Sequence, residues 1–198
     1  MKCSHDSGHS IICTDKSKVN WRQLKRKFEW WFKINYCFMA GEWPYYTEHP
    51  SIVCEKFLED PVAGELLDYK FFCFNGKPEM VFFASDRKHH VKADFYDLNW
   101  NLLPFRWLYE PSGKVFPKPE KLDDMIEYAK ILSEGFPFVR VDFYEIQGKV
   151  IFGELTFFHG GASGWFKPEQ IDYELGEKIN LPPKSNPWEH IVQATKRK

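Results

Sequence analysis

Residues 138–164, FVRVDFYEIQGKVIFGELTFFHGGASG, decide the fold that this sequence predicts. The stretch is typical of two long strands, rich in β-branched and aromatic residues, that are joined by a turn and followed by a glycine-rich loop. Two carboxylates, Asp142 and Glu154, lie within these apolar strands. Burial of a carboxylate is costly unless it is paired or binds a metal. The hairpin therefore predicts a functional site as well as a core.

The length of the turn decides whether the two carboxylates face each other, because side chains alternate between the faces of a sheet. A two-residue turn at Gln147-Gly148 would place Asp142 opposite Gly153 and send Glu154 to the other face. A purely structural hairpin would tolerate that arrangement. A three-residue loop, Gln147–Lys149, would place Asp142 directly opposite Glu154. We expect the three-residue loop because it gathers all the polar groups of the hairpin on one surface.

The hairpin is one of several segments that together resemble the TupA-like family of ATP-grasp proteins. The segments are DYKFFCFNGKP (68–78), Asp86-Arg87, FVRVDFY (138–144) and FGELTFFHGG (152–161). ATP-grasp enzymes carry R-x-D, about a dozen residues and then E-x-N at their metal site. Thr156 stands where most of them have asparagine, although threonine is usual in this subfamily. A threonine hydroxyl is a weaker ligand than an amide oxygen.

This resemblance implies an α+β, ATP-grasp-like fold with mixed or antiparallel sheets, packed helices and a nucleotide cleft between two subdomains. The expected domains are a small subdomain at 1–60, a catalytic subdomain at 61–180 and a loose tail at 181–198. The implied cofactors are ATP and Mg²⁺. The implied metal ligands are Asp142, Glu154 and Thr156, and the implied catalytic residues are Arg140 and Arg87. The implied nucleotide contacts are Lys2, Ser7, Gly8, Glu55, Lys56, Phe57, Leu58, Asp68 and Lys70.

The resemblance also implies a function. ATP-grasp ligases join a carboxylate to an amine through an acyl phosphate, and this family is linked to the synthesis of cell-surface polymers of the teichuronopeptide kind. The expected substrates are therefore small-molecule or polymer carboxylates and amines, with the 160–164 loop on the acyl phosphate. Two alternatives stay open. One is a glycosyltransferase whose acidic pair holds a metal under a nucleotide sugar, and the other is an inactive nucleotide-binding remnant.

The first residues, MKCSHDSGHSIIC, resemble the family segment in which a lysine-bearing strand enters a small phosphate-covering loop. Lys2 and the backbone of Ser7-Gly8 would then contact the phosphates. The chain would thus begin in the middle of an ATP-grasp protein, without its N-terminal domain. Two other interpretations stay open: an ordinary loop, and a zinc site. The zinc site would use Cys3, His5, His9 and Cys13, whose spacing is not the usual one.

The rest of the chain supplies the expected scaffold. Apolar periodicity predicts helices over 20–39, 119–135 and 168–179, the first with Asn20 as N-cap. Strands are expected over 51–58, 68–75, 79–85 and 92–98, with a hairpin turn at Asn75-Gly76. In the family, the 51–58 strand is the hinge against which adenine lies. A plain core strand is the alternative there, and for Lys70 the alternative is an ordinary surface lysine.

Composition excludes several classes of protein. The net charge of −1 over 198 residues gives no bulk electrostatic reason to expect nucleic acid or an anionic membrane as partner. The sequence contains no run of about 18 apolar residues and no signal peptide, so no membrane span is expected. The 5 cysteines include no C-x-x-C pair, and their odd number suits reduced thiols. We therefore expect a cytoplasmic protein.

Overall fold

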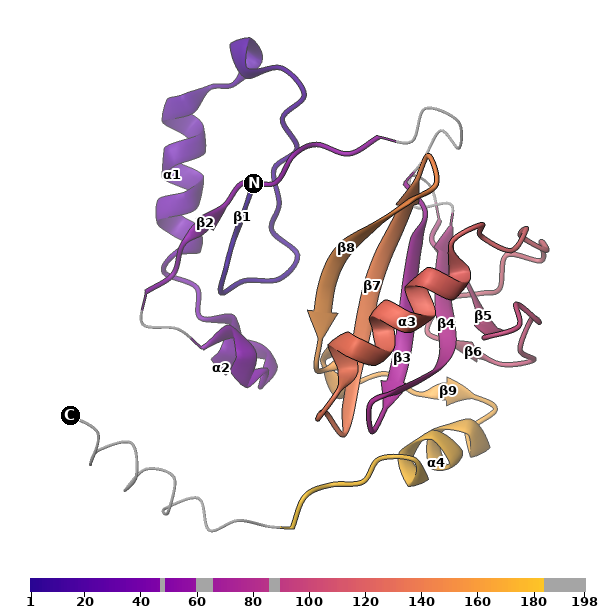
Figure 1. Ribbon diagram of the computed structural model, residues 1–198. Helices are drawn as coiled ribbons and strands as arrows, with labels where there is room; N and C mark the ends of the chain where they lie inside the picture. The colour runs from indigo at the N-terminus through magenta and orange to yellow at the C-terminus, as the bar shows by residue number, and fades with distance from the viewer. Residues whose placement is uncertain (47–48, 60–65, 86–89, 184–198) are drawn as a thin grey trace.

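The computed structural model describes residues 1–46, 49–59, 66–85 and 90–183. Its centre is an antiparallel sheet with the strand order β5-β4-β3-β7-β8 (Figure 1). These strands are β3 (Asp68–Phe74), β4 (Lys77–Ser85), β5 (Lys92–Asp97), β7 (Phe138–Ile146) and β8 (Lys149–Thr156). The expected hairpin at Asn75-Gly76 is confirmed, and both of its turn residues have positive φ, 50° and 77°. The expected α+β class with antiparallel sheets is confirmed as well.

The turn between β7 and β8 corrects one prediction. It has two residues, Gln147 and Gly148, with φ of 51° and 70°, so the expected three-residue loop is wrong. Asp142 nevertheless pairs with Glu154, because the register shifts by one residue between the Phe143–Phe152 pair and this pair. Gly153 is the extra residue of this bulge. A Cβ at Gly153 would lie 3.0 Å from the carbonyl oxygen of Asp142, which explains the glycine.

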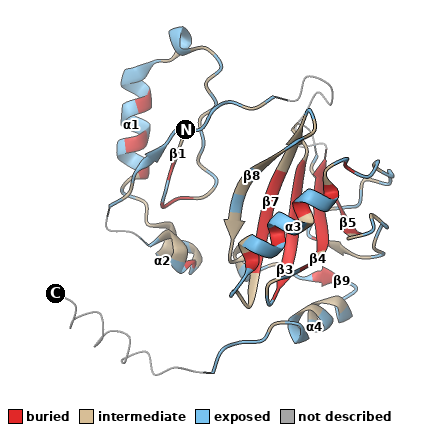
Figure 2. Cartoon of the chain, viewed as in Figure 1, coloured by how far each residue is buried: buried red, intermediate tan, exposed pale blue. Residues whose placement is uncertain are grey.

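The two faces of the sheet have different coverings. Helix α3 (Leu122–Ser133) packs across one face and contacts β3, β4 and β7. The core under it includes Phe71, Val81, Val141 and Met125, each at 0% exposure, and Figure 2 shows the central strands as largely buried. The expected 119–135 helix and its packing against the hairpin are therefore confirmed, with slightly shorter bounds.

The opposite face is apolar at one end and polar at the other. The apolar end is covered by β6 (Arg106–Trp107), β9 (Phe166–Lys167) and α4 (Gln170–Glu177). Helix α4 confirms the helix expected over 168–179. The polar end carries alternate residues of β3 and β7, beginning with Asp68 and Lys70. The packed apolar end thus holds the strands in place, and the other end of the same strands carries polar side chains.

The N-terminal segment forms a separate, smaller core (Figure 1). Its elements are β1 (Lys2–Cys3), η1 (Lys16–Lys18), α1 (Trp21–Trp31), α2 (Tyr36–Ala40), η2 (Trp43–Tyr45) and β2 (Ile52–Val53). Asn20 caps α1 as expected, accepting a hydrogen bond from the Gln23 N–H at 3.0 Å. The single helix expected over 20–39 is wrong, because Asn35 has extended backbone, with φ −108° and ψ 95°, and separates α1 from α2.

The strand expected over 51–58 is also wrong in length. Only β2 is strand, antiparallel to β1, and residues 54–57 are exposed without regular structure. Exposures of 37% for Val53 and 43% for Phe57 exclude the plain core strand as well. The β1–β2 pairing ends at Val53, so residues 54–57 have no strand that would hold them in a core.

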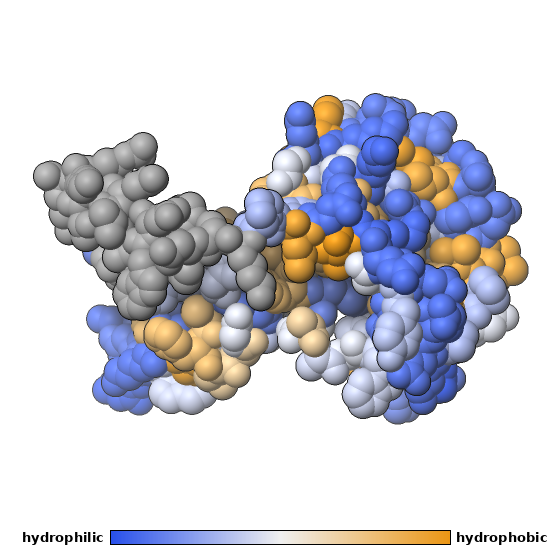
Figure 3. Space-filling view, turned by 90° about the horizontal axis from the view of Figure 1, so that it is seen from below, coloured by the Kyte–Doolittle hydropathy of each residue, from blue (hydrophilic) through white to orange (hydrophobic). Residues whose placement is uncertain are grey.

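Seen from below, the surface is mainly hydrophilic with separate apolar patches (Figure 3). Among the described residues no helix has both the length and the apolar character needed to cross a membrane. The expected boundary at 60/61 and most of the 181–198 tail fall outside the described residues, so the domain division stays a prediction.

Candidate functional site

Three neighbouring strands bring the polar residues of the hairpin into one row. Lys70 of β3 pairs with Asp142 of β7, and Asp142 pairs with Glu154 of β8. One step further along, Arg140 pairs with Thr156. All these residues lie on the face of the sheet opposite α3. The expected gathering of the polar groups on one surface is therefore confirmed, although the bulge at Gly153 achieves it rather than the turn.

The guanidinium of Arg140 is the centre of this cluster. Its Nε donates to Oδ1 of Asp142 at 2.7 Å, and its Nη2 donates to Oδ2 of the same carboxylate at 2.7 Å. Nη2 also lies 2.9 Å from Oγ1 of Thr156 and 3.2 Å from Oε1 of Glu154. Burial opposes the charge of Arg140, but the hydrogen bond to Asp142 and the nearby carboxylates outweigh it, so its pKa is raised.

Lys70 is the second cation of the cluster. Its Nζ lies 2.7 Å from Oδ2 of Asp68 and also donates to Oδ2 of Asp142. Asp68 and Asp142 are 2% and 1% exposed, and Lys70 is 8% exposed. Together with Glu154, the cluster holds three carboxylates and two cations, a formal charge of −1. Each buried carboxylate therefore has a cation, which is the condition for burying it.

His159 belongs to the site but was not predicted from the sequence. Its Nδ1 accepts a hydrogen bond from Nη1 of Arg140 at 2.9 Å, so the other ring nitrogen carries the proton. Burial, together with the charges of Arg140 and Lys70, lowers the pKa of His159 to about 3. The ring packs against Phe72 and Trp107, at centroid distances of 4.7 and 4.1 Å. Its position in the sequence, three residues after the Glu154-Leu155-Thr156 end of β8, could have indicated that it belongs to the site.

The glycine-rich loop after β8 has a packing role that the sequence did not reveal. The loop contains η3 (His159–Ala162). A Cβ at Gly160 would lie 2.5 Å from the ring of Trp107, and one at Gly164 would lie 2.3 Å from it. Both glycines are thus required by the indole that covers His159. The expected role of this loop on an acyl phosphate stays a prediction.

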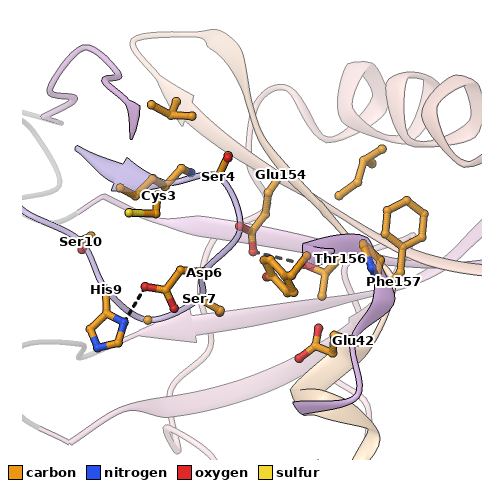
Figure 4. Close-up of a pocket in the computed structure, with 16 residues that line it drawn as sticks. Cys3, Ser4, Asp6, Ser7, His9, Ser10, Glu42, Glu154, Thr156 and Phe157 are labelled. Atoms are coloured by element: carbon orange, nitrogen blue, oxygen red, sulfur yellow. Dashed lines mark hydrogen bonds and ion pairs between the residues drawn. The ribbon is translucent and has the colours of Figure 1, made fainter. Parts of the chain in front are cut away.

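A cavity of about 430 Å³ separates the N-terminal loop from β8 (Figure 4). The structure brings together five predicted residues in its walls: Lys2, Ser7 and Gly8 on one side and Glu154 and Thr156 on the other. Gly8 has a φ of 86° and no atom within 4 Å of its Cβ position. Left-handed glycines of this kind turn backbone N–H groups toward anions.

Other residues of the cavity wall were missed. Asp6 accepts a 2.6 Å hydrogen bond from Nδ1 of His9, whose ring stacks on Trp31. Tyr45 contacts the side chain of Ser7. Burial raises the pKa of Tyr45 and also that of Glu42, which lies in the same wall. Short polar residues in loops give no periodic signal, so their convergence was not readable from sequence.

The metal-binding alternatives are limited by the side chains present. In the described part of the chain, no group of three or more His, Cys, Asp and Glu residues could hold a metal ion. The zinc alternative for Cys3, His5, His9 and Cys13 is therefore not supported. His5 instead stacks on Phe32. A magnesium site on the hairpin would have two carboxylates and a hydroxyl.

Several predicted nucleotide contacts lie elsewhere. Of the hinge residues 55–58, the first three are exposed, and Glu55 forms an ion pair with Lys2 at 3.3 Å. Asp68 and Lys70 lie within the ion-pair cluster rather than among the cavity-lining residues. Arg87 lies outside the described residues. The roles proposed for these residues stay predictions.

The family model described as TupA-like ATPgrasp matches residues 1–180 of the 198-residue chain. No curated protein and no solved structure matches the chain. The match spans the N-terminal loop, the central sheet and the carboxylate cluster. The chain belongs to the TupA-like ATPgrasp family.

Proposed function

We propose that the protein is an ATP-dependent ligase that joins a carboxylate to an amine through an acyl phosphate. The observation that carries this proposal is the cavity between two complementary walls. One wall has a lysine and a glycine turn, and the other has Glu154 and Thr156 at the edge of the arginine–carboxylate cluster. Membership of an ATP-grasp family supports ATP as the ligand.

The N-terminal wall would bind the phosphates. The Lys2 ammonium supplies positive charge, and the Ser7-Gly8 turn supplies backbone N–H groups. The backbone of 55–58 would contact adenine, since this segment is tied to the same wall by the Glu55–Lys2 ion pair. Under this proposal Asp68 binds the ribose, and Lys70 and Arg87 bind phosphates.

The opposite wall, with Asp142 buried behind it, has the donor chemistry for Mg²⁺. Asp142, Glu154 and Thr156 supply hard oxygen ligands, and their oxygens lie within hydrogen-bond distance of one shared atom of Arg140. The side chain of Glu154 is 52% exposed and lines the cavity, so it can meet an incoming ion. When bound, the ion would neutralise phosphate charge.

The reaction follows from these groups. An oxygen of the substrate carboxylate attacks the γ-phosphorus, the bond to the bridging oxygen breaks, and ADP leaves. The guanidinium of Arg140 stabilises the charge of the transferring phosphoryl group. An amine nitrogen then attacks the carbonyl carbon, loses a proton and releases phosphate. The amide product suits the assembly of a cell-surface polymer, which is the wider role we propose.

A thermal-shift titration with Mg·ATP tests the proposal. We expect the wild-type melting temperature to rise with Mg·ATP, and the rise to be lost in Asp142→Asn/Glu154→Gln. Glu120→Gln, which changes an exposed carboxylate outside the cavity, is the matched control and should keep the rise. If no nucleotide raises the melting temperature of the wild-type chain, the proposal is overturned.

The same titration separates the alternatives. A shift with a UDP-sugar but none with ATP would favour the glycosyltransferase, whose metal would use the same acidic pair. A shift with Mg·ATP in a chain that releases no phosphate, even slowly, would favour the inactive remnant. Slow release of phosphate that disappears in the double variant would support the ligase.

A further inference from the structure

The three candidate metal ligands converge on one atom of the protein itself. Nη2 of Arg140 lies 2.7 Å from Oδ2 of Asp142, 2.9 Å from Oγ1 of Thr156 and 3.2 Å from Oε1 of Glu154. A single nitrogen therefore occupies the point that the oxygens surround. The other guanidinium nitrogens are held at 2.7 Å by Oδ1 of Asp142 and at 2.9 Å by His159.

A metal ion and this nitrogen cannot occupy that point together. Mg²⁺ binds oxygen at about 2.0–2.1 Å with near-octahedral geometry. An ion bound by all three oxygens would lie within about 5 Å of Nη2, at the centre of the hydrogen bonds that hold the guanidinium. Two positive charges at such a distance would also repel each other strongly. The three oxygens therefore hold either the guanidinium or the ion.

We infer that Arg140 is a resident cation of this site, and that it must leave the three oxygens before a divalent ion can bind them. This inference rests on the proposed function. The triphosphate that accompanies the ion offers the released guanidinium a new anionic partner, with the bidentate geometry that arginine favours. The exchange keeps every carboxylate paired throughout. It also makes binding of the metal depend on binding of the nucleotide.

Lys70 provides a matched contrast. It is also a buried cation and also contacts Asp142, but no contact to Glu154 or Thr156 is among its described interactions. Removing Lys70 therefore takes a charge from the cluster without clearing the point of convergence. Removing Arg140 does both. The difference between the two variants isolates the occupation of that point from the general effect of charge.

The test is a titration with Mn²⁺ alone, as a stand-in for Mg²⁺, followed by calorimetry and by the electron paramagnetic resonance of the free ion. We expect Arg140→Met to bind Mn²⁺ at least about tenfold more tightly than the wild type. Lys70→Met should gain less than about threefold, and Arg140→Met/Glu154→Gln should lose the gain. Equal affinity in wild type and Arg140→Met, or an equal gain in both single variants, would overturn the inference.

A second measurement uses the wild-type chain, in case Arg140→Met does not fold. The Nε–H signal of Arg140 in ¹⁵N spectra should shift when Mg²⁺ and ATP are added together, and not with Mg²⁺ alone. A signal that stays unchanged with Mg·ATP under saturating conditions would contradict the exchange. If ATP binds nowhere, the proposed function fails, while the Mn²⁺ titration still decides whether the arginine excludes the metal.

Discussion

The two walls of the cavity are built on different physical principles. The wall on β8 is backed by a buried network in which Asp142 is 1% exposed and contacts two cations. The N-terminal wall carries an exposed ion pair instead, because the side chains of Lys2 and Glu55 are 38% and 60% exposed. Breaking a buried ion pair is costly, whereas breaking an exposed ion pair costs little. The cavity thus lies between a wall backed by buried ion pairs and a wall with an exposed one.

The largest expected effect is the difference between a lysine of the buried network and a lysine of the N-terminal wall. Lys70→Met leaves Asp68 and Asp142 without their shared ammonium and should lower the free energy of unfolding by about 3–5 kcal/mol. Lys2→Met removes only the exposed pair with Glu55 and should cost at most about 1 kcal/mol. Urea unfolding of both variants measures the difference. Similar losses in the two would remove the distinction between the walls.

The second effect is the pH dependence of stability that His159 gives to the buried network. The pKa of His159 is lowered from 6.5 to about 3, so the folded state keeps the ring neutral where the unfolded state takes up a proton. The neutral ring therefore costs no stability above pH 6.5, and the free energy of unfolding falls as the pH falls from 6.5 toward 3. The loss reaches about 3 kcal/mol by pH 4.

The variant His159→Asn provides the control for that window. Its side-chain oxygen can still accept the hydrogen bond of Arg140, but it does not titrate. Chemical unfolding between pH 7 and 4 should therefore show a shallower loss of stability in this variant than in the wild type. Parallel curves for the two proteins would mean that the ring is protonated without cost.

A third comparison uses Gly164 of the loop after β8 and Gly8 of the N-terminal wall. Gly164→Ala places a Cβ 2.3 Å from the buried indole of Trp107 and should destabilise the fold by about 2–3 kcal/mol. Gly8→Ala meets no atom within 4 Å and should cost only about 1 kcal/mol for its left-handed backbone. Thermal unfolding gives both values. If the steric explanation holds, shrinking the ring with Trp107→Phe should recover part of the loss in Gly164→Ala.

The smallest effect concerns the support of the exposed wall. Asn20→Ala removes the N-cap of α1, whose Trp31 carries the His9 ring, and should cost about 1 kcal/mol. Hydrogen exchange should show faster opening of α1 and unchanged protection of β3 and β7. Equal loss of protection in both regions would show that the two cores unfold as one unit.

The sequence predicted well where long-range pairing agrees with local pattern. The hairpin, α3 and the facing of Asp142 and Glu154 were all predicted, because alternation and apolar periodicity are strong there. The hinge strand was wrong because the β1–β2 pairing stops at Val53 and gives residues 54–57 no strand to pair with. His159 and the Asp6–His9 pair were missed because these residues lie in loops, whose contacts depend on the finished fold.

The bulge at Gly153 reverses which face of the sheet the alternate residues of β8 point to. Before it, Phe152 lies opposite Phe143, and after it Glu154 lies opposite Asp142, so two residues separated by one position look to opposite sides of the sheet. Deleting Gly153 would close the bulge and leave both pairings intact, whereas any larger side chain there meets the Asp142 carbonyl and the Tyr144 ring. At this position the chain tolerates the loss of a residue better than its replacement.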